Sequence, residues 1–270
     1  MNTAQLKTFC TQVRRDIIEL TAASGSGHPG GSLSAVELMS AIFCTQMRID
    51  PKNPKDPDRD RFVLSKGHAA PCYYGVLAEL GFFDKAEFAH FRQLHGMLQG
   101  HPDMKKIPGV DASTGSLGQG VSIAAGMALG AKHQKKDTKV YAILGDGECQ
   151  EGMVWEAFMA ASHYKLDNLT VVIDNNGLQI DGKNDDVMSL GDLAAKLRAF
   201  GFDLIELADG NDLDQVLAAL NTPAVPGKPR AILAHTVKGK GVSFMENQAG
   251  WHGKAPSAQE REQALKELEG

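Results

Sequence analysis

The stretch "KVYAILGDGECQEGMVWEAFMAASHYKLDNLTVVIDNNG" (residues 139–177) decides the fold. It begins with an apolar run at 139–144, continues with a helical pattern at 151–164, and ends with a second apolar run at 169–174. Strands that are apolar throughout and joined by helices are typical of a parallel sheet covered on both faces. The stretch therefore predicts a strand–helix–strand unit of an α/β protein.

The same alternation continues on both sides of this unit. Apolar runs predict further strands at 61–65, 202–207 and 230–236, and helical spacing predicts helices at 3–21, 33–47, 72–80, 116–132, 192–200, 211–220 and 261–269. We expect Ser32 or Ser34 to cap the second of these helices. The prediction is an α/β fold with an open, mostly parallel sheet and helices on both faces, forming a single domain over residues 1–270.

Composition excludes several functional classes. The net charge of −5 gives no indication of a nucleic-acid partner or of an anionic membrane surface. The longest apolar runs are too short to span a bilayer, and the polar start is unlike a signal peptide. The four cysteines contain no CxxC pair, so neither a zinc site nor a disulfide framework is indicated. We expect reduced, mostly buried thiols in a cytoplasmic protein.

Asp146 lies between two glycines directly after a predicted strand. Asp-Gly is ordinary turn chemistry, so this short motif is compatible with a plain turn or with a carboxylate that faces a metal or a phosphate. Asn176 follows the next strand, and parallel strands bring both residues to the same edge of the sheet, where such folds bind ligands. Their oxygens suit Mg²⁺ or Ca²⁺, and Gly145 and Gly147 let the backbone approach a diphosphate.

Several glycine-rich stretches occur in an order that resembles one family. They are "SGHPGGSLS" (26–34), "LSKGHAAPCYYG" (64–75), "GHPDMKKIPGVDASTGSLGQG" (100–120), "GDGECQEG" (145–152), "IDNNGLQIDG" (173–182), "HTVKGKGVSFMEN" (235–247) and "WHGKAP" (251–256). Together they resemble the diphosphate-binding domain of transketolase, including the spaced GDG and NN of the thiamine diphosphate motif. The resemblance implies a thiamine diphosphate-binding fold for nearly the whole chain.

The resemblance also implies a cofactor site. Asp146 and Asn176 match the metal side-chain ligands, and Leu178 matches the residue whose carbonyl completes the metal site. Gly147 matches a backbone contact to the diphosphate. Leu117 lies where the family holds the aminopyrimidine through backbone atoms. The implied cofactors are thiamine diphosphate and Mg²⁺, or Ca²⁺ in its place.

Four histidines and one glutamate complete the implied site. His68 resembles the family histidine near the diphosphate and the substrate, and His252 matches the one that contacts both. His28 and His101 resemble the histidines that line the reactive thiazolium side, where imidazoles can move protons near pH 7. Glu151 matches an acid that links two cofactor sites across a dimer.

The resemblance covers only one domain of the family. Transketolases activate the aminopyrimidine with a glutamate on a second α/β domain, and nothing up to Gly270 resembles that domain. We therefore expect the N-terminal subunit of a split transketolase, a transferase that pairs with a C-terminal subunit in a heteromer with at least two copies of each. It would transfer a two-carbon ketol unit from a ketose phosphate to an aldose phosphate, as in pentose phosphate metabolism.

Two alternatives remain at this point: a component of another thiamine diphosphate enzyme such as 1-deoxyxylulose-5-phosphate synthase, or a non-catalytic homologue. No role is implied for Glu148 or Cys149, and we expect Cys149 to be a packed thiol. The helices at 116–132 and at 151–164, the latter with Met153, Trp155 and Phe158, are the expected partner face.

Overall fold

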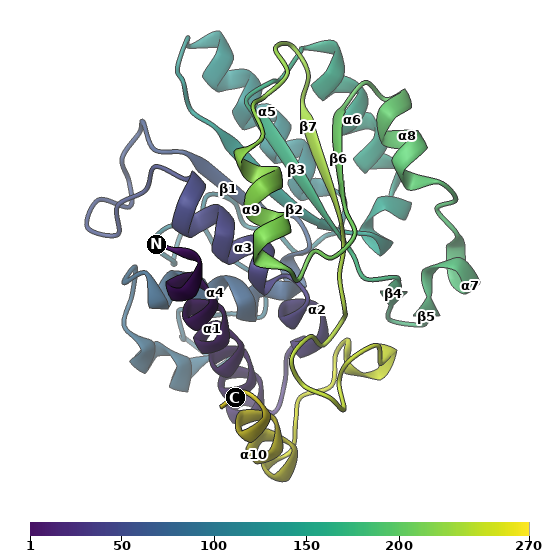
Figure 1. Ribbon diagram of the computed structural model, residues 1–270. Helices are drawn as coiled ribbons and strands as arrows, with labels where there is room; N and C mark the ends of the chain where they lie inside the picture. Colours follow the sequence, from purple (N-terminus) through teal and green to yellow (C-terminus); the bar gives the residue numbers. More distant parts are fainter. Residues whose placement is uncertain (270) are drawn as a thin grey trace.

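The computed structural model describes residues 1–269 and contains the expected parallel sheet (Figure 1). Its strand order is β1-β2-β3-β7-β6, and all neighbouring strands are parallel. The strands are β1 (Arg61–Leu64), β2 (Val140–Gly145), β3 (Leu169–Asn175), β6 (Asp203–Leu207) and β7 (Arg230–His235). The predicted fold class is confirmed, and Gly270, the last residue of the expected domain, lies outside the described residues.

Helices cover both faces of the sheet, and each face has its own apolar core. On one face lie α1 (Thr3–Ser24), α3 (Val36–Ala41), α4 (Ala70–Glu79) and α9 (Leu213–Asn221); on the other lie α5 (Gln119–His133), α6 (Gly152–His163) and α8 (Leu193–Ala199). Strand side chains alternate between the two cores, as Tyr141 and Ala142 do. None of the helices described is both long and apolar enough to cross a membrane.

The remaining elements are short and lie mainly around the carboxyl ends of the strands. They are α2 (Pro29–Leu33), the hairpin β4 (Leu178–Gln179) and β5 (Gly182–Lys183), α7 (Asn184–Met188), the short π-helix η1 (Ile42–Gln46), and the short 3-10 helices η2 (Gly67–Ala69), η3 (Lys85–His90), η4 (Gly147–Gln150) and η5 (Ala249–Trp251). The terminal helix α10 (Ala258–Glu267) packs against α1. Neither the hairpin nor α7 is predicted by the sequence pattern.

The prediction of one continuous helix over 33–47 is wrong. The helical segment begins at Pro29, a favoured first-turn residue, and is interrupted before α3 begins at Val36. The expected serine cap is also wrong, because α3 has no side-chain cap. The Ser34 hydroxyl instead donates to the Asp174 carboxylate at 2.6 Å, and Ser32 donates to the His28 carbonyl at 2.7 Å. Both hydroxyls thus donate hydrogen bonds to residues at the carboxyl edge of the sheet.

The strand register places the carboxyl ends of the central strands side by side at one edge of the sheet. Gly145 at the end of β2 lies opposite Asp174 of β3, and Asn175 lies opposite His235 of β7. The loops that follow these strands therefore begin at one edge of the sheet, as expected for an open α/β fold.

The loop that carries His101 is fastened to edge strand β1 by a buried ion pair. Asp111 accepts hydrogen bonds from Arg59 at 2.6 and 2.9 Å, from Arg61 at 3.1 Å and from the Phe62 backbone at 2.9 Å. The Asp111 and Arg59 side chains are only 4% and 8% exposed, so removing either partner would leave a buried charge uncompensated.

We expect Asp111→Ala to lower the free energy of unfolding by about 3–5 kcal/mol, because two arginines would lose their carboxylate. Urea denaturation of the chain measures this change. Asp58→Ala is the matched control, since Asp58 is 74% exposed in its pair with Lys136 and should contribute about 0–1 kcal/mol. Equal effects of the two substitutions would contradict the anchoring role of Asp111.

Candidate functional site

Asp146 joins the loops that follow β2 and β3. Its carboxylate accepts from the Gly147 backbone at 2.8 Å and from the Gly177 backbone at 2.5 Å, and the residue is 2% exposed. Burial and the nearby charge of Asp174 raise the pKa of Asp146. A cation beside this carboxylate would favour its charged form and so offset both effects. A plain turn would not require such a cation.

Asn176 and Leu178 lie in the second of these loops. The Asn176 Oδ1 accepts from the Leu178 backbone at 3.2 Å, and the Leu178 carbonyl accepts from the Lys238 ammonium at 3.1 Å. No cluster of three His, Cys, Asp or Glu that could hold a metal occurs among residues 1–269. A metal at Asp146 could also use the Asn176 amide oxygen and the Leu178 carbonyl oxygen, a set that suits a hard ion such as Mg²⁺.

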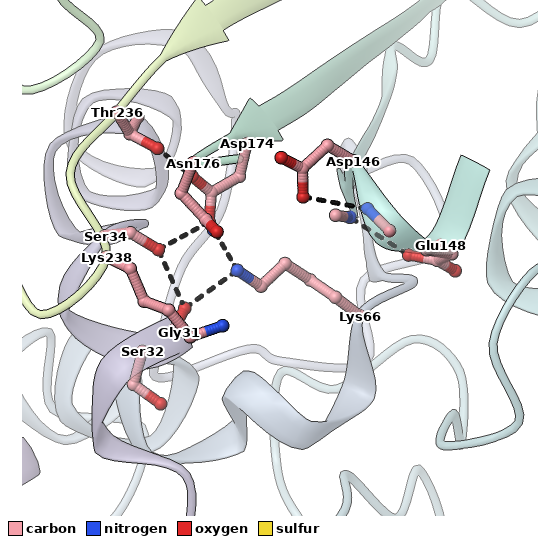
Figure 2. Close-up of polar contacts among 12 residues, drawn as sticks. Gly31, Ser32, Ser34, Lys66, Asp146, Glu148, Asp174, Asn176, Thr236 and Lys238 are labelled. Atoms are coloured by element: carbon pink, nitrogen blue, oxygen red, sulfur yellow. Dashed lines mark hydrogen bonds and ion pairs between the residues drawn. The ribbon is translucent and has the colours of Figure 1, made fainter. Parts of the chain in front are cut away.

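A buried ion pair lies beneath these loops, and sequence reasoning missed it. Figure 2 shows the Lys66 ammonium between the Asp174 carboxylate, with which it pairs, and the Gly31 carbonyl, to which it donates at 2.8 Å. The hydroxyls of Ser34 and Thr236 also donate to Asp174. Although burial opposes ionisation, Lys66 and these hydroxyls lower the pKa of Asp174. The pair links β1, β3, α2 and the loop after β7.

Lys238 is a second buried lysine that was not predicted. It is 1% exposed, and its ammonium donates to the Leu178 carbonyl at 3.1 Å and to His252 Nδ1 at 3.0 Å. Burial and the charge of Lys66 lower the pKa of Lys238 to about 8. Both lysines occur within glycine-rich motifs, "LSKGH" and "VKGKG", and this position was the only signal that could have identified them.

Glu148, to which no role was assigned, connects three segments. Its carboxylate accepts from the Ser65 hydroxyl at 2.5 Å, from the Gly118 backbone at 2.9 Å and from the Gly145 backbone at 3.1 Å. Burial raises the pKa of Glu148. The residue thus ties the start of α5 to the ends of β1 and β2, while the neighbouring Cys149 is a buried thiol, as expected.

Three of the four expected histidines form a cluster. The ring centroids of His28, His68 and His252 lie 4.9–5.5 Å apart. Burial is the main cause that lowers the pKa of each, to about 4 for His28 and to about 3 for His252, so these rings are neutral at pH 7. His101 is exposed and lies outside this ring cluster, with its ring against Gly115.

A cavity of about 190 Å³ unites most of the predicted site. All the predicted site residues except His28 and His101 line it: His68, Leu117, Asp146, Gly147, Glu151, Asn176, Leu178 and His252. Lys66 and Lys238 line it as well, whereas Leu117 and Glu151 are exposed at its rim. A larger cavity of about 690 Å³ contains none of these residues and lies near the starts of β1 and β2.

The cavity has the chemistry of a site for a diphosphate and its metal. Two lysines and two histidines can supply hydrogen-bond donors, and Asp146, Asn176 and Leu178 have oxygens that could bind a metal. Gly31 borders this space, because a Cβ there would be in van der Waals contact with His68 Nε2 at 3.4 Å and with Lys66 Nζ at 3.6 Å. The residues present therefore fit the cofactor that the motifs imply.

We expect Lys66→Met to lower the free energy of unfolding by about 3–5 kcal/mol, because Asp174 is fully buried and would lose its counter-ion. Lys240→Met is the matched control, since Lys240 pairs with Glu246 at 3.9 Å near the surface and should contribute about 0–1 kcal/mol. Urea denaturation compares the two variants. A small loss for Lys66→Met would show that the hydroxyl donors alone sustain the Asp174 charge.

Known proteins are similar in sequence to nearly the whole of this chain. Residues 7–269 match the family described as transketolase, thiamine diphosphate binding domain. The chain is 40% identical to one of the subunits of apulose-4-phosphate transketolase from Phocaeicola vulgatus, covering 94% of this chain and 90% of that protein. It is 41% identical to a 6-deoxy-6-sulfo-D-fructose transketolase subunit from a Clostridium species, covering 95% and 94%.

The fold matches solved transketolases equally well. The structure superposes on transketolase from Campylobacter jejuni with a TM-score of 0.93 and 31% identity, covering all of this chain but only 43% of that one. The chain thus spans less than half the length of this solved enzyme. The chain belongs to the transketolase family, in which it corresponds to the N-terminal, thiamine diphosphate-binding part.

Proposed function

We propose that this chain is the N-terminal subunit of a split transketolase that depends on thiamine diphosphate and Mg²⁺. The observation that supports this most directly is the 190 Å³ cavity. It is lined by oxygens of the kind that bind Mg²⁺, by two buried lysines and by two histidines. We also propose that the whole chain, residues 1–270, forms one diphosphate-binding domain. The four free cysteines among the described residues are consistent with a cytoplasmic protein.

In this proposal Asp146, Asn176 and the Leu178 carbonyl hold the Mg²⁺ ion, which Ca²⁺ could replace. The Gly147 backbone, His68 and His252 bind the diphosphate, and the buried ammonium groups of Lys66 and Lys238 add positive charge around it. At the rim, Leu117 would contact the aminopyrimidine through its backbone. Glu151, also at the rim, would link this site to a second cofactor site across a dimer. In this proposal the diphosphate is therefore bound by Gly147, His68 and His252, which the sequence predicted, and by Lys66 and Lys238, which it did not.

The chemistry is transfer of a two-carbon ketol unit from a ketose phosphate to an aldose phosphate. Thiamine diphosphate, when bound, supplies the carbon centre that carries this unit. His28 and His101 would donate and accept protons at sugar hydroxyl and carbonyl oxygens, together with His68 and His252. Because burial keeps the rings of His28, His68 and His252 neutral at pH 7, each ring offers one donor and one acceptor nitrogen.

A partner protein is part of this proposal. Two relatives that match over nearly their full length are named as subunits of transketolases. We propose a C-terminal subunit with the activating glutamate and a heterotetramer of two copies each. On the expected partner face, Met153 and Met159 of α6 are 40% and 61% exposed, and Ile123 and Leu129 of α5 are each 37% exposed. Phe158, also expected there, is instead fully buried in the core.

We expect Asp146→Ala to abolish Mg²⁺-dependent binding of thiamine diphosphate, because it removes the only anionic metal ligand. Asn176→Ala should weaken binding less, since a neutral ligand is lost. Titration calorimetry on the assembled protein measures both. Asp181→Ala is the matched control, because this carboxylate is exposed and lines the same cavity but is not a proposed ligand. Unchanged affinity in Asp146→Ala contradicts the metal site.

The function itself is tested by assaying ketol transfer with thiamine diphosphate, Mg²⁺ and a ketose phosphate–aldose phosphate pair. The chain alone should show no turnover, and adding the C-terminal subunit that co-purifies with it from its source should restore turnover. Activity of the chain alone would contradict the split arrangement. Cofactor binding by the complex without ketol transfer would favour another thiamine diphosphate reaction, and no cofactor binding would favour a non-catalytic homologue.

A further inference from the structure

Arg92 stands beside the proposed active site in an unusual backbone conformation. Its φ of 58° lies in the left-handed region, which is uncommon for residues other than glycine and costs on the order of 1 kcal/mol or more. The Arg92 backbone donates to the Leu98 carbonyl at 2.8 Å, which closes the loop that precedes His101. This backbone directs the guanidinium toward the loop that carries His28.

The guanidinium of Arg92 has no carboxylate partner within residues 1–269. Its Nη1 donates to the Ser26 hydroxyl at 2.8 Å, its Nη2 lies 3.4 Å from His28 Nδ1, and its Nε is buried without a partner. A Cβ at Gly100 would lie 2.9 Å from the guanidinium carbon, so this glycine provides the space. An unpaired, half-buried cation is unfavourable for stability, which points to a functional reason for its position.

The contact between Arg92 and His28 favours one position for the imidazole proton. A guanidinium can only donate hydrogen bonds, so His28 Nδ1 must act as the acceptor. With Nδ1 as acceptor, the proton of the neutral ring lies on Nε2, which is 3.8 Å from the position that a Gly253 Cβ would occupy.

The other groups around His28 also favour a neutral ring. His68 and His252 contact it, and His101 and Lys238 act on it through their charge, together with Arg92. Burial followed by these charges lowers the pKa of His28 to about 4, and no carboxylate is among the groups that act on it. The ring is thus neutral with or without Arg92 near pH 7, and what Arg92 adds is a defined hydrogen bond to one nitrogen.

We propose that Arg92 is a positioning residue for His28: it fixes the ring as the Nε2–H tautomer, so that His28 presents a hydrogen-bond donor to a hydroxyl or carbonyl oxygen of the sugar. The role in sugar chemistry rests on the proposed transketolase function, whereas the hydrogen bond from Arg92 to His28 does not. Ser26, by accepting from Nη1, holds the guanidinium in the plane that this contact needs.

Nuclear magnetic resonance of the chain labelled with ¹⁵N-histidine tests the contact without cofactor or turnover. His28, assigned by the loss of its signals in His28→Gln, should carry its proton on Nε2 and should have an unprotonated Nδ1. Arg92→Leu should shift the Nδ1 signal, introduce the Nδ1–H form, and raise the His28 pKa by about one pH unit. Arg92→Lys, which keeps a cationic donor, should show a smaller change in each.

The control is Arg198→Leu, because the Arg198 side chain is 60% exposed on α8 and should not affect His28. A wild-type His28 with its proton on Nδ1 would overturn the proposal. So would an Arg92→Leu variant in which the Nδ1 signal and the His28 pKa match those of the control.

A second measurement separates positioning from loop stability. In the complex with the C-terminal subunit, Arg92→Leu should lower kcat about 10-fold or more without changing the affinity for thiamine diphosphate, and Arg92→Lys should partly restore kcat. Equal losses of kcat and cofactor affinity, without rescue by lysine, would overturn the positioning role. If the wild-type complex shows no ketol transfer, the proposed function fails, and the tautomer measurement still decides the role of Arg92.

Discussion

The ion pair between Lys66 and Asp174 is the interaction on which the carboxyl edge of the sheet depends. It joins the end of β1 to the end of β3, and through the Gly31 carbonyl and the Thr236 hydroxyl it also holds α2 and the loop after β7. The loops after β1, β2 and β3, which line the cavity, start next to this pair. Because both side chains are at most 2% exposed, the pair acts as a fixed internal support whose hydrogen-bonding capacity is met by its surroundings.

This support also decides the charge of the site. Asp174 neutralises Lys66, and in the proposed function Asp146 would face the metal while Lys238 and the histidines would face the diphosphate. Among the described residues, the buried Lys238 ammonium donates only to a carbonyl and an imidazole, so a bound anion would offset its charge. Around His28 the histidine rings are neutral, and Arg92 contacts one ring nitrogen. The proposed function would use both properties, since thiamine diphosphate brings several negative charges and a sugar substrate would bring hydroxyl groups.

Much of this arrangement was predictable from sequence. The apolar runs and helical spacing predicted the parallel sheet, and the strand ends predicted that Asp146 and the Asn176 loop would meet, because both depend on local pattern. The functions of the histidines came only from the resemblance. Lys66 and Lys238 were missed because a loop lysine is normally solvated, and burial is a property of the assembled fold. The position of Arg92 likewise depends on contacts between loops that no local pattern encodes.

The most direct test of the account is a crystal structure of the protein, with its partner subunit, grown with thiamine diphosphate and Mn²⁺ in place of Mg²⁺. Anomalous scattering would locate the metal independently of the protein density. We expect one Mn²⁺ bound by the Asp146 carboxylate, the Asn176 amide oxygen and the Leu178 carbonyl, with the diphosphate between the metal and the His68 and His252 rings. A metal–diphosphate pair bound elsewhere, such as in the larger cavity near the starts of β1 and β2, would contradict it.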